Sequence, residues 1–146
     1  MKRFLIILLF FLSVSFYGQI DSSTNIYYVR VDTNYYDRHG LFLTQTELKD
    51  GNWIILYNNG KTYAKYNLKD KKIIDTAYYY WPNGNLLICE VYKNGLLDGE
   101  KKNYHRNGKI NVISFWSNGL KVGIWKYYND KGKLIKKIKG IDSSTG

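Results

Sequence analysis

Asn-Gly dipeptides recur along this 146-residue chain at a spacing that constrains its fold more than any other feature of the sequence. Five such dipeptides lie between aromatic and aliphatic runs, and the turn glycines Gly60, Gly84, Gly108 and Gly132 are each 24 residues apart. Asn-Gly between two hydrophobic runs is a strong hairpin signal, because a type I′ turn needs a positive φ at both central residues. The spacing therefore predicts a series of β-hairpins.

A second turn lies 11 residues after the first in each repeat. Asn94-Gly95 and Asn118-Gly119 mark it, and Asp70-Lys71 occupies the same place one repeat earlier. One hairpin is marginally stable in water, whereas several side by side bury a continuous face. The 15 tyrosines and the single proline also favour strands. We therefore expect an all-β fold, an elongated antiparallel meander of repeated β-hairpins over residues 51–140.

Residues 1–19 have the pattern of a helical secretory signal peptide. Lys2 and Arg3 give the positive start, and the apolar run Phe4–Leu12 is too short to cross a bilayer as a helix. Small residues then offer cleavage points at Ser13-x-Ser15 and at Gly18, before Gln19. We expect export to the periplasm, the cell envelope or the extracellular space, with a retained N-terminal anchor as the alternative.

The segments outside the hairpin repeats are short. Residues 20–50 are predicted to hold N-terminal strands, at Ile26–Val31 and Leu41–Leu48, together with a degenerate repeat. In that repeat His39-Gly40 takes the place of the later Asn-Gly turns. Residues 141–146 are predicted to be a C-terminal tail.

The repeat resembles a known family in three stretches. They are Asn94-Gly95-Leu96-Leu97-Asp98-Gly99, Tyr104-His105-Arg106-Asn107-Gly108-Lys109, and the run from Asn118 to Tyr128. These stretches resemble MORN-type repeats, in the variant found in bacterial proteins often labelled antitoxin-like. The resemblance covers residues 51–140 well and 26–50 weakly. It implies an elongated antiparallel sheet that serves as a scaffold for protein contacts or binds lipid headgroups, and the label implies an antitoxin or immunity role.

Treating each Asn-Gly as a two-residue loop predicts which residues pair and therefore share a face of the sheet. The predicted pairs are Tyr57–Thr62, Trp53–Tyr66, Trp81–Leu86, Tyr79–Ile88, Asp75–Tyr92, Gly99–Trp116 and Trp125–Ile138. The tryptophans Trp53, Trp81, Trp116 and Trp125 then share one face. The other face carries Leu56, Tyr80, Tyr104 and Tyr128, with Leu87, Val91, Ile113, Phe115 and Ile135 opposite them.

Both predicted faces are partly apolar, which leaves three explanations open. The N-terminal strands cover one face, the sheet curls to shelter its concave side, or the tryptophan face binds a partner, because large exposed apolar patches mark interaction sites. On the last explanation Trp53, Trp81, Trp116 and Trp125 are the partner-binding residues.

The formal net charge is +10, and it becomes about +8 when Lys2 and Arg3 leave with the leader, since 20 basic residues then face 12 acidic ones. This charge is either a solvated surface or a basic patch. The densest run suggests contact with anionic lipid through Lys126, Lys133, Lys136, Lys137 and Lys139. Export argues against nucleic acid as a partner.

Residue types needed for catalysis are not found at catalytic spacing. Cys89 is the only cysteine, and the two histidines, His39 and His105, each lie beside a turn without a second metal ligand nearby. No nucleophile elbow, carboxylate pair of clear spacing or phosphate-binding loop is present. We therefore expect a non-enzyme without cofactor or metal: an exported interaction scaffold or binding module of a bacterial cell envelope. The alternatives are a peripheral binder of anionic lipid and an antitoxin or immunity protein.

Overall fold

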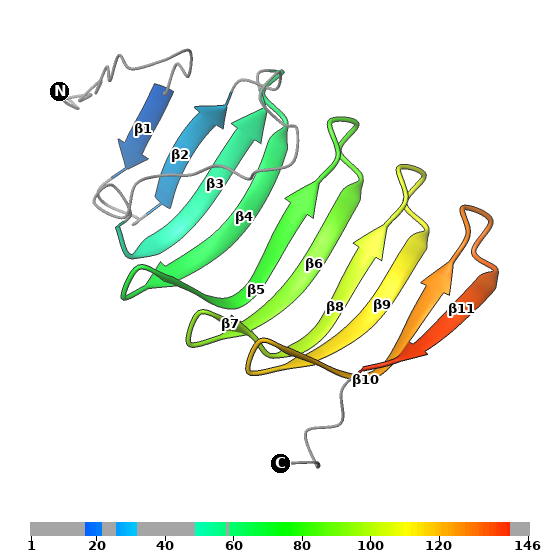
Figure 1. Ribbon diagram of the computed structural model, residues 1–146. Coiled ribbons are helices and arrows are strands. Elements are labelled where there is room, and N and C mark those ends of the chain that lie inside the picture. The colour runs from blue at the N-terminus through cyan, green and yellow to red at the C-terminus, as the bar shows by residue number, and fades with distance from the viewer. Residues whose placement is uncertain (1–16, 22–25, 32–48, 58, 141–146) are drawn as a thin grey trace, which may run out of the picture.

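The computed structural model describes residues 17–21, 26–31, 49–57 and 59–140 (Figure 1). Most of the predicted leader, the predicted strand Leu41–Leu48, the His39-Gly40 turn and the predicted tail lie outside the described residues. Within them the chain forms one layer, an 11-stranded sheet without a helix. The all-β prediction is confirmed for this part of the chain.

The strands follow one another across the sheet in nearly sequential order, β1-β2-β3-β4-β5-β6-β8-β9-β10-β11, and the short β7 pairs with β6 alone. Their bounds are β1 Tyr17–Asp21, β2 Ile26–Val31, β3 Gly51–Tyr57, β4 Thr62–Lys69, β5 Lys72–Tyr80, β6 Leu86–Lys93, β7 Leu96–Leu97, β8 Gly99–Tyr104, β9 Ile110–Ser117, β10 Leu120–Tyr128 and β11 Leu134–Lys139. From β3 to β11 every neighbouring pair is antiparallel, which confirms the meander over residues 51–140.

The N-terminal strands depart from the meander. β2 runs parallel to β3, with Ile26 opposite Asn52 and Val31 opposite Tyr57, so the prediction of an antiparallel sheet is wrong at this one pair. Parallel neighbours need a crossover connection rather than a tight turn. In agreement with this, no Asn-Gly turn motif lies between residues 31 and 51. β1, Tyr17–Asp21, pairs antiparallel with β2 and runs across the predicted end of the leader.

Two kinds of turn alternate along the meander. Type I′ turns occur at Asp70-Lys71, Asn94-Gly95 and Asn118-Gly119, where both central residues have a positive φ. The loop at Gly84 is different: Gly84 N–H donates to the Trp81 carbonyl (2.8 Å) and Trp81 N–H donates to the Asn85 carbonyl (2.7 Å). These bonds enclose three residues, and only the glycine has a positive φ. The same pattern recurs at Gly108 and Gly132, so the two-residue prediction is wrong for these loops.

The extra loop residue changes the register only beside the loop. Tyr80, rather than the predicted Trp81, pairs with Leu86, and Leu56 takes the place of Tyr57 opposite Thr62. A β-bulge one residue further into each hairpin then restores the predicted register. The confirmed pairs are Trp53–Tyr66, Tyr79–Ile88, Asp75–Tyr92, Gly99–Trp116 and Trp125–Ile138.

The core lies on the face that carries the tryptophans, here called the tryptophan face; the other is called the opposite face. Ile55, Ala64 and Tyr79 pair in one row across β3, β4 and β5, and Ile55 is 2% exposed and Ala64 0%. Trp53 and Leu68 complete this buried cluster, against which Tyr63, Tyr66, Ile73 and Tyr79 pack. Tryptophan-face residues thus supply the buried centre of the sheet.

Candidate binding surface

The four tryptophans predicted to bind a partner have different environments. Trp53 is 5% exposed, belongs to the core and donates its indole N–H to the Lys49 carbonyl (2.9 Å). Trp81 is half-buried at the end of β5, and its indole N–H lies 3.3 Å from the Tyr104 carbonyl. The Arg106 guanidinium lies over its ring at 5.3 Å. Trp53 is therefore closed to a partner, and Trp81 is partly covered by the next repeat.

Trp116 and Trp125 are brought together by β9 and β10, with ring centroids 5.2 Å apart. The Trp116 indole N–H donates to the Ser114 hydroxyl (3.2 Å), and that of Trp125 lies 3.3 Å from the Phe115 carbonyl. The Lys121 ammonium sits over the Trp125 ring at 4.9 Å. This pair is half-buried and held by the sheet itself.

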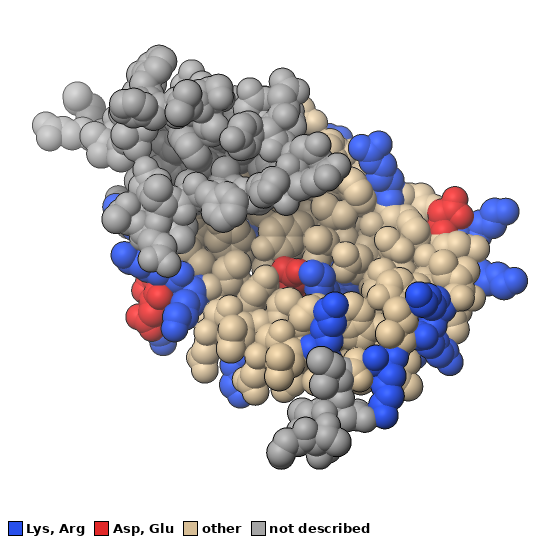
Figure 2. Space-filling view, in the orientation of Figure 1, with Lys and Arg blue, Asp and Glu red and all other residues tan. Residues whose placement is uncertain are grey.

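A buried ion pair interrupts the tryptophan face between these groups. Glu90 is 6% exposed, forms an ion pair with Lys101 and accepts a hydrogen bond from the Tyr92 hydroxyl (2.7 Å). Burial, followed by the hydrogen bond to Glu90, raises the pKa of Tyr92 well above its usual value. Burial likewise raises the pKa of Tyr66 to about 12. Figure 2 shows one acidic side chain beside a basic one near the middle of the visible surface, with further basic side chains below and to the right of them.

The opposite face carries most of the exposed large hydrophobic side chains among the described residues. By strand pairing and alternation, seven of the eight lie here: Tyr78 (39%), Leu96 (49%), Phe115 (37%), Leu120 (58%), Ile124 (51%), Leu134 (40%) and Ile135 (63%). None of the buried core residues does. The sheet therefore packs through one face and leaves apolar side chains in solvent on the other.

Lysines alternate with these apolar groups. One row of paired residues crosses the opposite face through Lys65, Tyr78, Cys89, Lys102, Ile113, Lys126 and Lys137. Glu100 lies beside this row and forms a half-exposed ion pair with Lys102. The opposite face is thus both apolar and basic.

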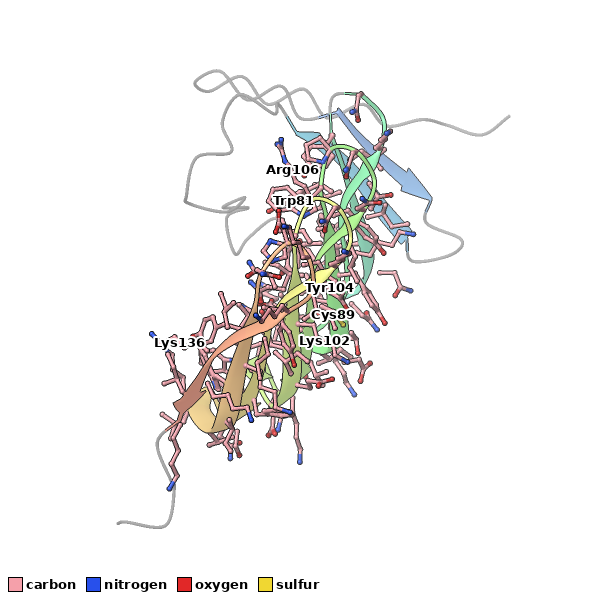
Figure 3. The ribbon with its side chains drawn as sticks, turned by 90° about the vertical axis from the view of Figure 1, so that its right-hand side faces the viewer. Trp81, Cys89, Lys102, Tyr104, Arg106 and Lys136 are labelled. Atoms are coloured by element: carbon pink, nitrogen blue, oxygen red, sulfur yellow. The ribbon has the colours of Figure 1, made fainter. Side chains whose placement is uncertain are left out.

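The five lysines predicted to contact anionic lipid do not form one patch. Lys126, Lys137 and Lys139 lie on the opposite face, next to Ile124 and Ile135. Lys136 pairs with Tyr127 on the tryptophan face, and Figure 3 shows it projecting away from the side that holds Cys89 and Lys102. Lys133 follows the last loop glycine and is exposed. A flat surface could therefore contact three of the five at once.

Cys89 lies on the opposite face between Tyr78 and Lys102 and is half-buried. Burial raises the pKa of its thiol, and the nearby Lys102 only partly offsets this. The thiol is therefore protonated at neutral pH and is a weak nucleophile.

The three-residue loops are linked from one hairpin to the next, a feature that the sequence alone did not reveal. The Asn83 amide donates to the Arg106 carbonyl (3.0 Å), and the Asn107 amide donates to the Asp130 carbonyl (2.8 Å). Each amide oxygen also accepts the backbone N–H two residues on, at Asn85 and Lys109 (both 3.0 Å). The asparagine of these Asn-Gly pairs therefore joins loops.

A second row of bonds runs parallel to the first. The side chains of Tyr57, Trp81 and His105, 24 residues apart, contact the carbonyls of Tyr80, Tyr104 and Tyr128 at 2.6, 3.3 and 3.0 Å. A carbonyl can only accept, so Nε2 of His105 carries the proton in this bond. Trp81 and His105 thus occupy a position that supports the next repeat.

No group of three or more His, Cys, Asp or Glu side chains gathers in the part of the chain that the structure describes. Over the same residues, no helix is both long enough and apolar enough to pass through a membrane.

Comparison with known families identifies the repeat. Residues 76–94, 97–118 and 121–139 match the MORN repeat variant, which confirms the resemblance for three repeats. The matched segments run from β5 to β11; each contains one three-residue loop, and the two-residue turns at Asn94-Gly95 and Asn118-Gly119 fall at the boundaries between segments. The match gives no support to the antitoxin-like label. No curated protein and no solved structure matches the chain.

Proposed function

We propose that this chain is an exported, non-catalytic repeat protein that acts as a binding module of the bacterial cell envelope, and that it contacts its partner through the opposite face. One observation carries the proposal: seven of the eight exposed large hydrophobic side chains among the described residues lie on the face that does not hold the core. Exposed apolar patches of this kind are typical of interaction sites. The repeat match is consistent with a binding role.

The side chains of the opposite face indicate which kind of partner it can bind. Lys126 and Lys137 flank exposed Ile124 and Ile135, and no carboxylate lies in β10 or β11. We propose an acidic protein surface or an anionic envelope polymer with apolar groups as the partner. Trp81, Trp116 and Trp125 form the competing candidate surface, because each remains half-exposed on the tryptophan face.

Two matched variants separate the surfaces. Changing both Ile124 and Ile135 to serine is expected to weaken capture of the partner from a native envelope fraction by about tenfold or more, since each exposed anchor contributes on the order of 1 kcal/mol. The melting temperature should change little. Trp116→Ala is the comparison on the tryptophan face. If it abolishes capture while the serine variant captures normally and both stay folded, the contact surface is assigned to the wrong face.

A peripheral lipid-binding function is the second candidate, favoured by Lys126, Lys137 and Lys139 beside exposed isoleucines on one face. Each lysine near an anionic surface contributes about 1 kcal/mol. Co-sedimentation with anionic but not zwitterionic vesicles at low salt would select this function over protein capture. An antitoxin or immunity role stays a prediction from the resemblance, and a toxin gene beside this gene would support it.

A further inference from the structure

β11 is the C-terminal edge of the sheet. Among the described strands it pairs only with β10, and all six of its residues are exposed (Figure 1). An edge strand offers unpaired backbone groups to any extended chain that can align with it. The edge can therefore accept a further strand.

The backbone of β11 alternates between bonding to β10 and pointing away from it. Gly140 N–H donates to the Gly123 carbonyl (2.7 Å), and the register pairs Ile138 with Trp125 and Lys137 with Lys126. Hydrogen-bonded and non-bonded pairs alternate in an antiparallel ladder. Ile138 therefore bonds to β10, whereas the peptide groups of Lys137 face outward.

The links between loops change at this edge. Asn129 stands where Tyr57, Trp81 and His105 stand in earlier repeats, and its amide oxygen accepts the N–H groups of Lys131 and Lys133 within its own loop (3.1 and 2.8 Å). Lys131 replaces the asparagine that bridges to the next loop. Two of the positions that support a following hairpin have therefore been altered, so the edge is not built for another copy of the repeat.

Charge also argues against a second copy. Residues 131–139 contain five lysines and no carboxylate. Antiparallel pairing of two β11 strands would bring lysines opposite lysines, which is destabilising. An acidic strand would instead meet lysines along its whole length. The charge of β11 thus disfavours pairing with β11 of a second copy and favours pairing with an acidic strand.

We propose that β11 receives an extended, acidic segment of a partner protein by β-strand addition. Backbone hydrogen bonds to the outward peptide groups, such as those of Lys137, supply affinity. Carboxylates at alternate positions of the segment pair with Lys137 and Lys139 on the opposite face, and the apolar residues between them contact Ile138 on the tryptophan face. This inference does not rest on the opposite face as a binding surface.

The test uses the full chain and a labelled peptide of alternating glutamate and valine, with an alternating lysine and valine peptide for comparison. Fluorescence anisotropy should show saturable binding of the acidic peptide alone. Lys137→Pro removes the outward N–H while the bonded N–H of Ile138 remains, and proline is tolerated at such edge positions. Lys137→Pro should weaken binding at least tenfold more than Lys137→Gln, which loses the same charge.

Several outcomes would overturn the inference. One is equal weakening by the proline and glutamine variants, which would mean attraction by charge alone. If the acidic peptide does not bind, the edge does not accept such a strand. If the chain self-associates in sedimentation, the edge pairs with a second copy instead. Circular dichroism verifies that the proline variant keeps its sheet, and Lys72→Gln, which removes an exposed lysine in β5, should leave peptide binding unchanged.

Discussion

Replacing Trp53 with alanine is expected to lower the free energy of unfolding by about 3–5 kcal/mol, the usual cost of removing a large buried side chain. Trp53 is 5% exposed and lies among Ile55, Ala64 and Leu68, which are the centre of the core. The substitution leaves a cavity there and removes the donor to the Lys49 carbonyl. Denaturant unfolding followed by circular dichroism measures the loss.

The matched control is Tyr78→Thr, on the opposite face of the same sheet. Tyr78 is 39% exposed, and threonine, like tyrosine, favours a β-strand. The control should change stability by about 1 kcal/mol or less, as surface substitutions usually do. A loss below about 1 kcal/mol for Trp53→Ala, or a larger loss for the control, would show that the core does not lie on the tryptophan face.

Lys101→Met is expected to destabilise the protein by about 3 kcal/mol, because removing one partner of a buried ion pair leaves an uncompensated charge. Glu90 is 6% exposed and would keep only the Tyr92 hydroxyl as a donor among the bonds described above. Part of the Lys101 side chain is open to water, which holds the loss near the lower end of the usual range. Denaturant unfolding at neutral pH measures it.

Two further variants make this second prediction specific. Glu90→Met combined with Lys101→Met should recover most of the lost stability, since a buried pair can be replaced by apolar side chains at little cost. Lys102→Met, one residue along, breaks the more solvent-accessible ion pair with Glu100 and should cost less than about 1 kcal/mol. Equal losses for Lys101→Met and Lys102→Met would contradict a buried role for Glu90.

The register of the hairpins could be predicted from the sequence because the position of each turn fixes which residues lie opposite one another. Gly99 and Trp116 pair as expected, at the end of their hairpin far from its three-residue loop. The error was confined to residues beside the three-residue loops, such as Trp81. Asn-Gly is compatible with both loop lengths, since the glycine alone needs a positive φ in the longer one. Local sequence does not distinguish them.

The second role of asparagine could not be predicted from the dipeptide alone. Asn83 and Asn107 bridge to carbonyls 23 residues further on, and that contact exists only after neighbouring hairpins stack. The regular recurrence of Asn83 and Asn107 one repeat apart was the available signal. The row formed by Tyr57, Trp81 and His105 could not be predicted either. These three residues differ in type and share only their position in the repeat.

Which face is buried was also beyond the sequence, because both faces carry aromatic and aliphatic residues in alternation. The small residues Ala64 and Ala77, both 0% exposed, were the signal that was overlooked. They mark where large neighbours such as Tyr79 close over the sheet. The parallel pairing of β2 with β3 was not predicted either, since no turn motif specifies a crossover.

Hydroxyl-radical footprinting of the intact protein, read by mass spectrometry, measures which face of the sheet is buried and which is exposed to solvent. We expect rapid modification of Leu120, Ile124 and Ile135 on the opposite face and strong protection of Trp53 and Leu68 on the tryptophan face. Rapid modification of Trp53 together with protection of Ile124 and Ile135 would contradict the account, because the buried and contact faces would then be exchanged.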